Sequence, residues 1–552
     1  MIDRRQFLLG SLGGAAALAV AGCTSRSSPS SSAAAAGGRP TLRLPQGATG
    51  FPSPFAANAD IGYNQMSLIY DTLLWKDGDG QLLPWLAASW TVSEDHLTYT
   101  FVLRDGVKWA DGRPFTADDV TFTFDYYAAQ VTLSPPIIIQ PPQGIAKVRA
   151  VDPTTVEITL KSPQVTFPEQ VVGAVPIIPK QVWAPIKDPA SAQDRKVLVG
   201  TGPYRLASYD GDGGELLYLA RDDYFLGPPY VRRIEERAID DQFAGLLANN
   251  TDIARGQGLR PDTIAPFTAD KGYAVVTQSG STSSPLYWNM GREGPLSDVR
   301  FRRACAMAID RRDLVTRLAS GRGLPGNPGF LSPANPSYVP VPQYDFDVAG
   351  ANALLDAAGY RLPPGAGVRQ GPRGPLSFGL LMSNGDAALS ELLVADFKRV
   401  GIEVKPKLVQ IGPQLFGAKL VGDFDMAVLF FPGPGPGGPS ADPDILRLLF
   451  SSRLSASLEG AASYANPTFD DLADRQRETF DDAERKALVA QMQAILADDL
   501  PMLPLFYPEV AIVYRTKVLD QYYFTPGQFP AESDNKQLFV TGAKAGTQIR
   551  HS

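Results

Sequence analysis

Histidine is nearly absent from this sequence, which contains only His96 and His551. His96 stands in a short polar segment that begins at Ser93, and His551 is the next-to-last residue. A serine–histidine–aspartate triad or a histidine-rich zinc site needs histidines beside other reactive groups, and neither position offers this. No phosphate loop of the GxxxxGK[ST] type and no nucleophile elbow occurs either. We therefore expect no catalytic residues, no metal site and no cofactor.

Cysteine is equally scarce, with Cys23 and Cys305 as its two positions. If Cys23 carries a lipid, as proposed below, Cys305 has no partner and no internal disulfide can form. Cys305 lies within Arg-Arg-Ala-Cys-Ala-Met-Ala, a run that is typical of a helix interior. We expect Cys305 to be a small buried side chain with no chemical role.

Long apolar runs and an excess of basic charge are also missing. No apolar stretch after residue 23 reaches about 18 residues, so none is expected to span a membrane. The net charge is −7 and no basic stripe occurs, which argues against nucleic-acid binding. Two GxGxxG strings, at residues 321–326 and 433–438, are expected to be loops. The first follows a helix, and the second alternates with prolines, which have no amide hydrogen to offer a phosphate.

The beginning of the chain has the parts of an export signal. A charged start with Arg4 and Arg5 precedes an apolar stretch over residues 8–20, and small residues lead to Cys23. The arginine pair resembles a twin-arginine signal, and the general secretory route stays open. Val-Ala-Gly-Cys resembles a bacterial lipobox, so we expect residues 1–23 to be a signal peptide with lipidation of Cys23. Residues 24–40, rich in Ser, Ala and Gly, are expected to be a flexible tether.

The remaining chain alternates between strand and helix patterns. Strands are predicted at residues 98–104, 156–160 and 273–278 from alternating apolar side chains. Helices are predicted from Thr116, which can cap, and over residues 297–318, 347–359 and 481–500. Such a mixture over this length indicates an α/β protein.

Several motifs in a fixed order resemble the extracellular solute-binding proteins of family 5, the dipeptide- and oligopeptide-binding lipoproteins of ABC importers. The likeness extends from about residue 41 to about residue 530. It is carried by residues 68–75 (LIYDTLLW), 84–90 (PWLAASW), 98–120, 200–204 (GTGPY), 298–310 (DVRFRRACAMAID), 356–360 and 499–501.

The resemblance implies a two-lobed periplasmic-binding-protein-like fold of type II, in the large variant with an inserted subdomain. Residues 41–63, 185–285 and 505–552 would form lobe I, residues 64–184 the inserted subdomain, and residues 286–504 lobe II. Two strands would connect the lobes as a hinge. Most of the aromatic residues in these motifs are expected to be core: Tyr70, Trp75, Trp90, Trp109 and Tyr204.

The resemblance also implies a receptor that closes over a solute and delivers it to a permease. A short peptide is the leading solute, and an oligosaccharide or another non-peptide solute is the alternative. A carboxylate-dependent hydrolase and a surface adhesin or sensor are alternatives of other classes. The partners would be an ABC permease and ATPase encoded elsewhere. The protein would be an exported monomer, held at the outer face of the cell membrane by its lipid alone.

Three segments, expected as loops, are the candidates for solute contact: Tyr63 and Asn64; Tyr287, Trp288 and Asn289; and Phe430 and Phe431 with Asp442 and Asp444. Peptide binders of the family often place an aspartate in the last loop, where it pairs with the amino group of the peptide. Here Pro and Gly follow Phe431, and the first acid is Asp442. Three alternatives stay open. One of the two acids serves as the anchor, or both cap a helix starting near Ile445, or the anchor is absent. Without an anchor, the aromatic side chains would suit a neutral solute.

Overall fold

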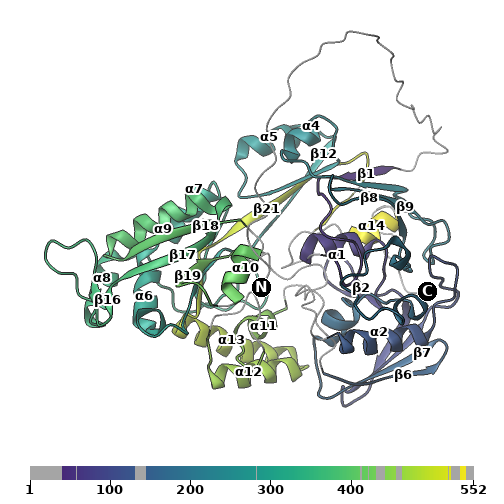
Figure 1. The fold of residues 1–552 in the computed structure, drawn as a ribbon, viewed down its shortest axis with the longest axis horizontal. Helices are drawn as coiled ribbons and strands as arrows, with labels where there is room; N and C mark the ends of the chain where they lie inside the picture. Colours follow the sequence, from purple (N-terminus) through teal and green to yellow (C-terminus); the bar gives the residue numbers. More distant parts are fainter. Residues whose placement is uncertain are drawn as a thin grey trace, which may run out of the picture. The chain divides into compact units, whose positions relative to one another are not determined.

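A computed structural model of the chain describes residues 40–57, 59–130, 144–280, 282–410, 413–420, 422–429, 442–454, 463–519, 521–523 and 535–541 (Figure 1). The predicted signal peptide, the predicted lipidation site Cys23, most of the predicted tether and His551 lie outside these residues. Phe430, Phe431 and the GxGxxG string at residues 433–438 lie outside them too.

One four-stranded sheet contains, in spatial order, β1 (Thr41–Leu44), β10 (Arg233–Glu236), β9 (Glu215–Ala220) and β8 (Tyr204–Asp210). β1 pairs with β10 in parallel, and the other neighbours are antiparallel. A second sheet has the order β4 (Ala87–Val92), β5 (Thr98–Leu103), β7 (Thr155–Leu160), β6 (Ile145–Asp152). Its strand β5 buries Tyr99, Phe101 and Leu103 on one face, as its alternating pattern predicts.

A five-stranded mixed sheet has the order β18 (Glu403–Val409), β17 (Ser377–Ser383), β19 (Met426–Val428), β13 (Pro285–Trp288), β20 (Met502–Pro504). Helices α6 (Val299–Ala308), α8 (Val348–Ala357) and α9 (Ala387–Arg399) share one hydrophobic core with this sheet. Cys305 is fully buried in that core as a free thiol, as expected from its helical setting.

The chain passes between sheets at two adjacent places. β11 (Ile253–Gln257), β21 (Phe506–Arg515) and β12 (Tyr273–Ser279) form a further sheet, in which β12 pairs with β21. Along the chain, β12 leads into β13, and β20 leads into β21. The pair β12–β21 therefore continues directly into the pair β13–β20 of the five-stranded sheet. The Leu505 N–H donates to the carbonyl of Ser284 (3.2 Å), which ties the two connections together.

β14 (Gly323–Pro325) adds to β21 beside this crossing. Small two-stranded sheets are β2 (Leu74–Lys76) with β3 (Leu82–Pro84) and β15 (Gln370–Gly371) with β16 (Gly374–Pro375). Other helices of the described residues are α1 (Ala59–Ser67), α2 (Ala117–Ala129), α3 (Lys180–Trp183), α4 (Gln242–Leu247), α5 (Pro261–Ala269), α7 (Arg311–Leu318), α10 (Pro413–Leu420), α11 (Ile445–Phe450), α12 (Pro467–Glu478), α13 (Asp482–Asp499) and α14 (Lys536–Thr541), with single turns η1 (Pro168–Val172), η2 (Arg195–Val197), η3 (Pro295–Ser297) and η4 (Asn384–Asp386).

Most local predictions are confirmed. Strands β5, β7 and β12 lie where alternation placed them. The Thr116 cap of α2 forms a capping box with Asp119, Asp347 accepts from the Gly350 N–H (2.8 Å) at the start of α8, and Asp481 caps α13 in the same way.

The single helix predicted over residues 297–318 is wrong. The structure has α6 and α7, separated at Ile309 and Asp310. The Asp310 carboxylate accepts from the Asp313 N–H (3.0 Å) and caps α7. An aspartate side chain can replace the helical hydrogen bond of the backbone, and this competing bond starts a new helix at that point.

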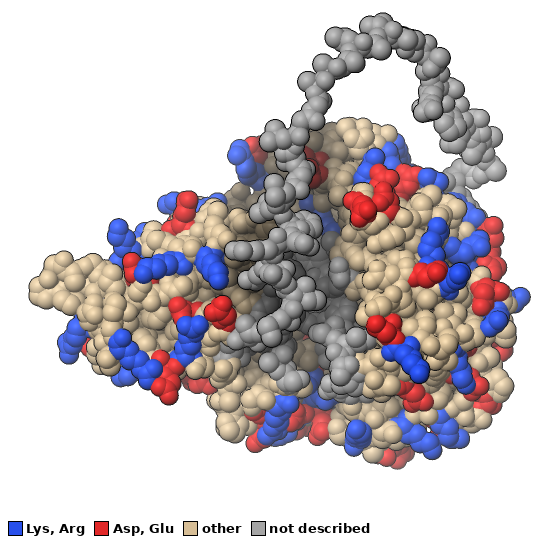
Figure 2. Space-filling model, viewed as in Figure 1, with Lys and Arg blue, Asp and Glu red and all other residues tan. Residues whose placement is uncertain are grey.

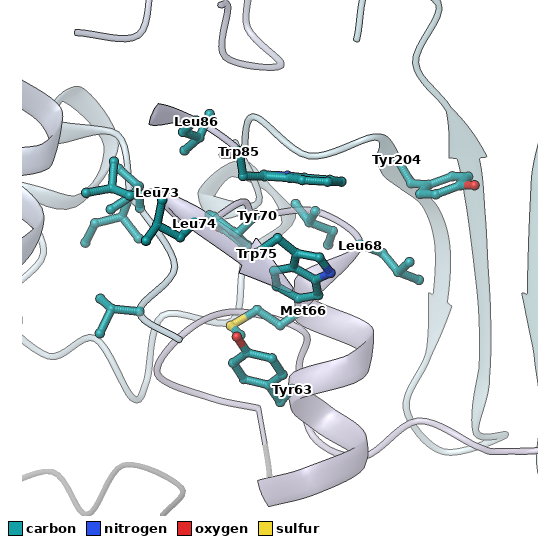
Figure 3. Close-up of a cluster of buried hydrophobic side chains, with 14 of the residues drawn as sticks. Tyr63, Met66, Leu68, Tyr70, Leu73, Leu74, Trp75, Trp85, Leu86 and Tyr204 are labelled. Atoms are coloured by element: carbon teal, nitrogen blue, oxygen red, sulfur yellow. The ribbon is translucent and has the colours of Figure 1, made fainter. Parts of the chain in front are cut away.

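The aromatic residues of the motifs pack as predicted. Tyr70, Trp75, Trp109 and Tyr204 are buried, and Trp90 is partly buried against the same core. In the close-up of Figure 3, Trp75, Trp85 and Tyr70 gather above Tyr63 and Met66 of α1. These residues build the scaffold.

Candidate functional site

Tyr63 and Asn64 lie on helix α1, so their predicted placement in a loop is wrong. The Tyr63 side chain is buried, and its hydroxyl donates to the carbonyl of Ala174 (3.0 Å). Asn64 is buried as well, and its carbonyl accepts from the Ser67 hydroxyl (2.8 Å). The Tyr63 bond ties α1 to the distant segment at Ala174, whereas the Asn64 bond lies within α1. A contact with solute stays a prediction for both residues.

Tyr287 and Trp288 lie on β13, an inner strand of the five-stranded sheet, so the loop predicted there is also wrong. Neighbouring residues of a strand point to opposite faces. Tyr287 belongs to the core with α11, α12 and α13, while Trp288 belongs to the core with α6, α8 and α9. The Lys419 ammonium lies 4.2 Å from the centre of the Tyr287 ring, a cation–π contact.

Asn289 follows β13 and binds the backbone just before β19. Its side-chain amide donates to the carbonyls of Gly422 (3.0 Å) and Phe424 (2.8 Å). These bonds fix the backbone that enters β19, the strand before the predicted solute loop. For Asn289, as for Tyr287 and Trp288, solute contact stays a prediction.

Asp442 is held by an arginine. Its carboxylate accepts from both terminal nitrogens of Arg485 (2.8 and 2.7 Å) and from the backbone N–H of Asp444 (2.8 Å). The side chain is 14% exposed. Burial raises the pKa of Asp442, and the Arg485 guanidinium opposes this effect.

Asp444 is fully buried and accepts four hydrogen bonds. Arg447 donates from Nε and from one terminal nitrogen (2.7 Å each), Gln476 donates to Oδ1 (2.6 Å), and Gln170 donates to Oδ2 (3.2 Å). Burial alone would raise the pKa of Asp444, but Arg447, together with the charge of Arg477 and the hydrogen bond from Gln170, outweighs it and lowers that pKa to about 2.

Each of the two acids is therefore neutralised by a bidentate guanidinium. A ligand ammonium that paired with either one would have to displace Arg485 or Arg447. The alternative that both acids cap the helix near Ile445 is wrong for Asp444, which stands at the N-cap of α11 without a side-chain capping bond. The sequence contains a signal for the pair of Asp444 and Arg447, because an acid stands three residues before an arginine at the start of a helix. Reasoning from the sequence missed this signal.

Metal chemistry and membrane crossing find no support in the described residues. No group of three or more His, Cys, Asp and Glu side chains within these ranges is arranged to hold a metal ion. No helix within them is both long enough and apolar enough to cross a bilayer. On the face shown in Figure 2, basic and acidic side chains are interspersed.

A sequence model of the bacterial extracellular solute-binding proteins, family 5 (middle region), matches residues 81–455. The chain belongs to this family. The nickel-binding periplasmic protein of Escherichia coli K12 is 26% identical over 474 residues, covering 82% of this chain and 87% of the relative. The dipeptide-binding protein of the same organism is 27% identical over 496 residues, covering 85% and 88%.

The fold agrees with this assignment. The oligopeptide-binding protein AppA of Bacillus subtilis, in complex with a nonapeptide, matches with a TM-score of 0.74 at 22% identity, covering 90% of this chain and 97% of that chain. The predicted fold class, a two-lobed α/β periplasmic-binding-protein-like fold, is confirmed. As a family member, the chain is an extracytoplasmic solute-binding protein of ABC import and not an enzyme.

Proposed function

We propose that this chain is the lipid-anchored receptor of an ABC importer, which captures short peptides by lobe closure and delivers them to a permease. The observation that carries closure is the pair of adjacent crossings, β12 to β13 and β20 to β21, tied by the bond between Leu505 and Ser284. Hinges of this kind need only a few residues at element ends to change their backbone angles.

The lobes are proposed with the boundaries expected from the sequence. Residues 41–63, 185–285 and 505–552 form lobe I, residues 64–184 its inserted subdomain, and residues 286–504 lobe II. The change of sheet at residues 280–285 and 504–506 supports the boundaries between the lobes.

A peptide solute is supported by the dipeptide-binding relative, which aligns over most of the chain. A second candidate, a neutral solute such as an oligosaccharide, is favoured by one observation. Both acids at the start of α11 are already paired with arginines. An uncompensated ammonium is costly to bury, so a peptide amino group needs a carboxylate from elsewhere or must displace Arg485.

Native mass spectrometry of freshly purified full chain tests the proposal. A series of peptide masses that dissociates on activation supports the peptide receptor, and a ladder of hexose masses supports the second candidate. A solute that is chemically converted during incubation overturns the receptor function.

Lipid anchoring is proposed at Cys23, followed by a tether over residues 24–40. A diacylated cysteine holds a soluble domain at a bilayer more firmly than one acyl chain does. We expect Cys23→Ser to move the protein from the membrane fraction to the soluble fraction, while Cys305→Ser stays in the membrane fraction. An unchanged distribution of Cys23→Ser contradicts the anchor.

A further inference from the structure

Three contacts connect the proposed inserted subdomain with the proposed lobe II, far from the hinge in sequence. The first is a backbone bond: the Val165 N–H donates to the carbonyl of Arg477 (2.9 Å). The Arg477 guanidinium in turn donates to the side-chain oxygen of Gln164. Arg477 lies in the last turn of α12, where carbonyls have no partner within the helix. The Val165 N–H, from the proposed inserted subdomain, therefore gives a carbonyl at the end of α12 the hydrogen-bond donor that the helix itself lacks.

The second contact is between Gln170 and Asp444. The Gln170 amide, on η1, donates to Oδ2 of the aspartate (3.2 Å), and both side chains are buried. Arg447 and Gln476 fix the carboxylate within its own lobe. Gln170 thus meets an acceptor that is already in position and that keeps its other bonds when Gln170 leaves.

The third contact stacks two rings. His96 and Phe480 lie with ring centres 3.8 Å apart and planes 10° apart. His96 is presented by the tight turn between β4 and β5, where it has a left-handed backbone (φ 56°) and donates its N–H to the carbonyl of Ser93 (2.9 Å). Phe480 lies between α12 and α13, which Figure 1 shows next to each other. Each ring is only half-buried, so each can separate from the other without leaving a core.

We propose that these three pairs, Val165 with Arg477, Gln170 with Asp444, and His96 with Phe480, form a closure seam. The seam holds the lobes together before solute arrives, and it breaks each time they open. Its members are positioning residues, which set the lifetime of the closed state. The inference rests on the proposed function, because it needs lobes that separate.

The seam differs from an ordinary core interface in its chemistry. Each contact joins polar or half-exposed groups that water can solvate once they part. The partners on the lobe II side are held by their own lobe, through Arg447, Gln476 and helix α12. Closing therefore orders few additional side chains, which keeps its entropic cost low.

Amide hydrogen exchange of the solute-free full chain, read by mass spectrometry, tests the seam at the Val165 N–H. The internal reference is the Leu160 N–H, which donates to Leu97 within the same subdomain (2.8 Å) and crosses no boundary. We expect Val165 to be protected. We expect Phe480→Ala and His96→Ala each to speed its exchange about threefold to tenfold, with Leu160 unchanged. The double variant should exceed either single variant by little, because both remove one contact.

Arg475→Ala is the matched control, since Arg475 is exposed on the same helix α12. It should leave Val165 unchanged. Arg477→Ala, which keeps the backbone acceptor but removes the bond to Gln164, should also speed exchange of Val165.

Two outcomes overturn the proposal, and they differ. The first outcome is that the Val165 amide exchanges fast in the parent protein, or that none of the seam variants changes its exchange rate. Either result contradicts the seam and does not affect the proposed receptor function. The second outcome is that the Val165 and Leu160 amides exchange only when the whole protein unfolds, in the parent and in every variant. It means that the lobes never separate. That result removes the seam and lobe closure alike.

Discussion

Asp442 and Asp444 stand two residues apart and have pKa values shifted in opposite directions. Both are paired with an arginine, so the difference comes from the remaining surroundings. The nearby charge of Arg477 and the amide of Gln170 also lower the pKa of Asp444, whereas the charges of Asp444 and Glu169 help to raise the pKa of Asp442. Asp442 receives one backbone donor besides Arg485, and desolvation prevails.

Replacing Asp444 by Ala should destabilise the protein strongly. It leaves the buried Arg447 without a counter-ion, a change that costs about 3–5 kcal/mol. Urea denaturation measures the difference in free energy of unfolding. The control is Asp471→Ala, which removes a 66% exposed partner of Arg453 and should cost less than about 1 kcal/mol. Equal losses in the two variants would contradict the assigned role of Asp444.

The same carboxylate should make stability depend on pH in acid. Its folded pKa, about 2, lies below the ordinary value of 3.8, so Asp444 stabilises the folded state above about pH 4. This contribution, on the order of 2 kcal/mol, is lost as the pH falls toward the folded pKa. We expect the gap in unfolding free energy between the parent and Asp444→Asn to shrink between pH 4 and pH 2. A gap that stays constant over this interval contradicts the depressed pKa.

At the scale of elements, the crossing between sheets is tightly packed. β14 lies against β21, and the Gly326 N–H donates to the carbonyl of Leu505 (3.1 Å). A Cβ atom at Gly326 would stand 1.7 Å from the carbonyl oxygen of Pro504. Only glycine allows the backbone to come this close to the proposed hinge.

Gly326→Ala should therefore cost about 1–3 kcal/mol of unfolding free energy by overpacking at the hinge. Gly367→Ala is the control, because a Cβ atom there meets no neighbour within 4 Å; its effect should stay within about 0.5 kcal/mol. Both are measured by urea denaturation. A neutral Gly326→Ala would show that β14 can move away from the crossing, and it would remove the argument that this contact restricts the hinge.

The split of α6 from α7 shows a conflict between two local signals. Apolar spacing continues through Ile309 and favours one long helix, whereas Asp310 favours a new N-terminus. The cap prevails, because Asp310 also receives help from the fold: its N–H donates to Asp396 on α9 (3.3 Å). Periodicity alone does not contain that long-range bond.

In the molecule as a whole, helix α14 near the C-terminus is tied to the motif at residues 68–75, which contains Asp71. Lys536 and Asp71 form a fully buried ion pair (2.5 Å), and Trp85, Thr201 and Tyr224 also donate to Asp71. Thr201, Tyr224 and Lys536 are all far from Asp71 in sequence, so the carboxylate joins distant segments. This network ties the proposed inserted subdomain, which contains Asp71 and Trp85, to the proposed lobe I.

Solution scattering should detect that motion. Because the proposed closure seam holds the solute-free parent largely closed, its radius of gyration should fall only slightly when the solute identified by mass spectrometry is added. The closure-seam variant Phe480→Ala should start from a larger value than the parent does, since more of it is open, and its radius should fall more on addition of the solute. One fixed radius under all these conditions contradicts a moving hinge.

The amino-acid sequence was enough to predict the family, the α/β class, the caps of α2, α8 and α13, and the burial of the motif aromatics. These depend on neighbours within a few residues or on hydrophobicity alone. The secondary structure predicted for several candidate residues was wrong. Tyr63 and Asn64 proved to be helical, Tyr287 and Trp288 proved to be an inner strand, and solute contact at these positions remains a prediction.

Three features depend on the three-dimensional arrangement of the chain. They are the arginine that neutralises each acid, the places where the chain crosses between sheets, and the groups that meet across the proposed lobes. Gln170 and Asp444 are 274 residues apart, and Val165 and Arg477 are similarly distant in sequence. Hydrogen bonds and ion pairs depend on distance and direction in space, and the local pattern of a chain specifies neither for partners this remote.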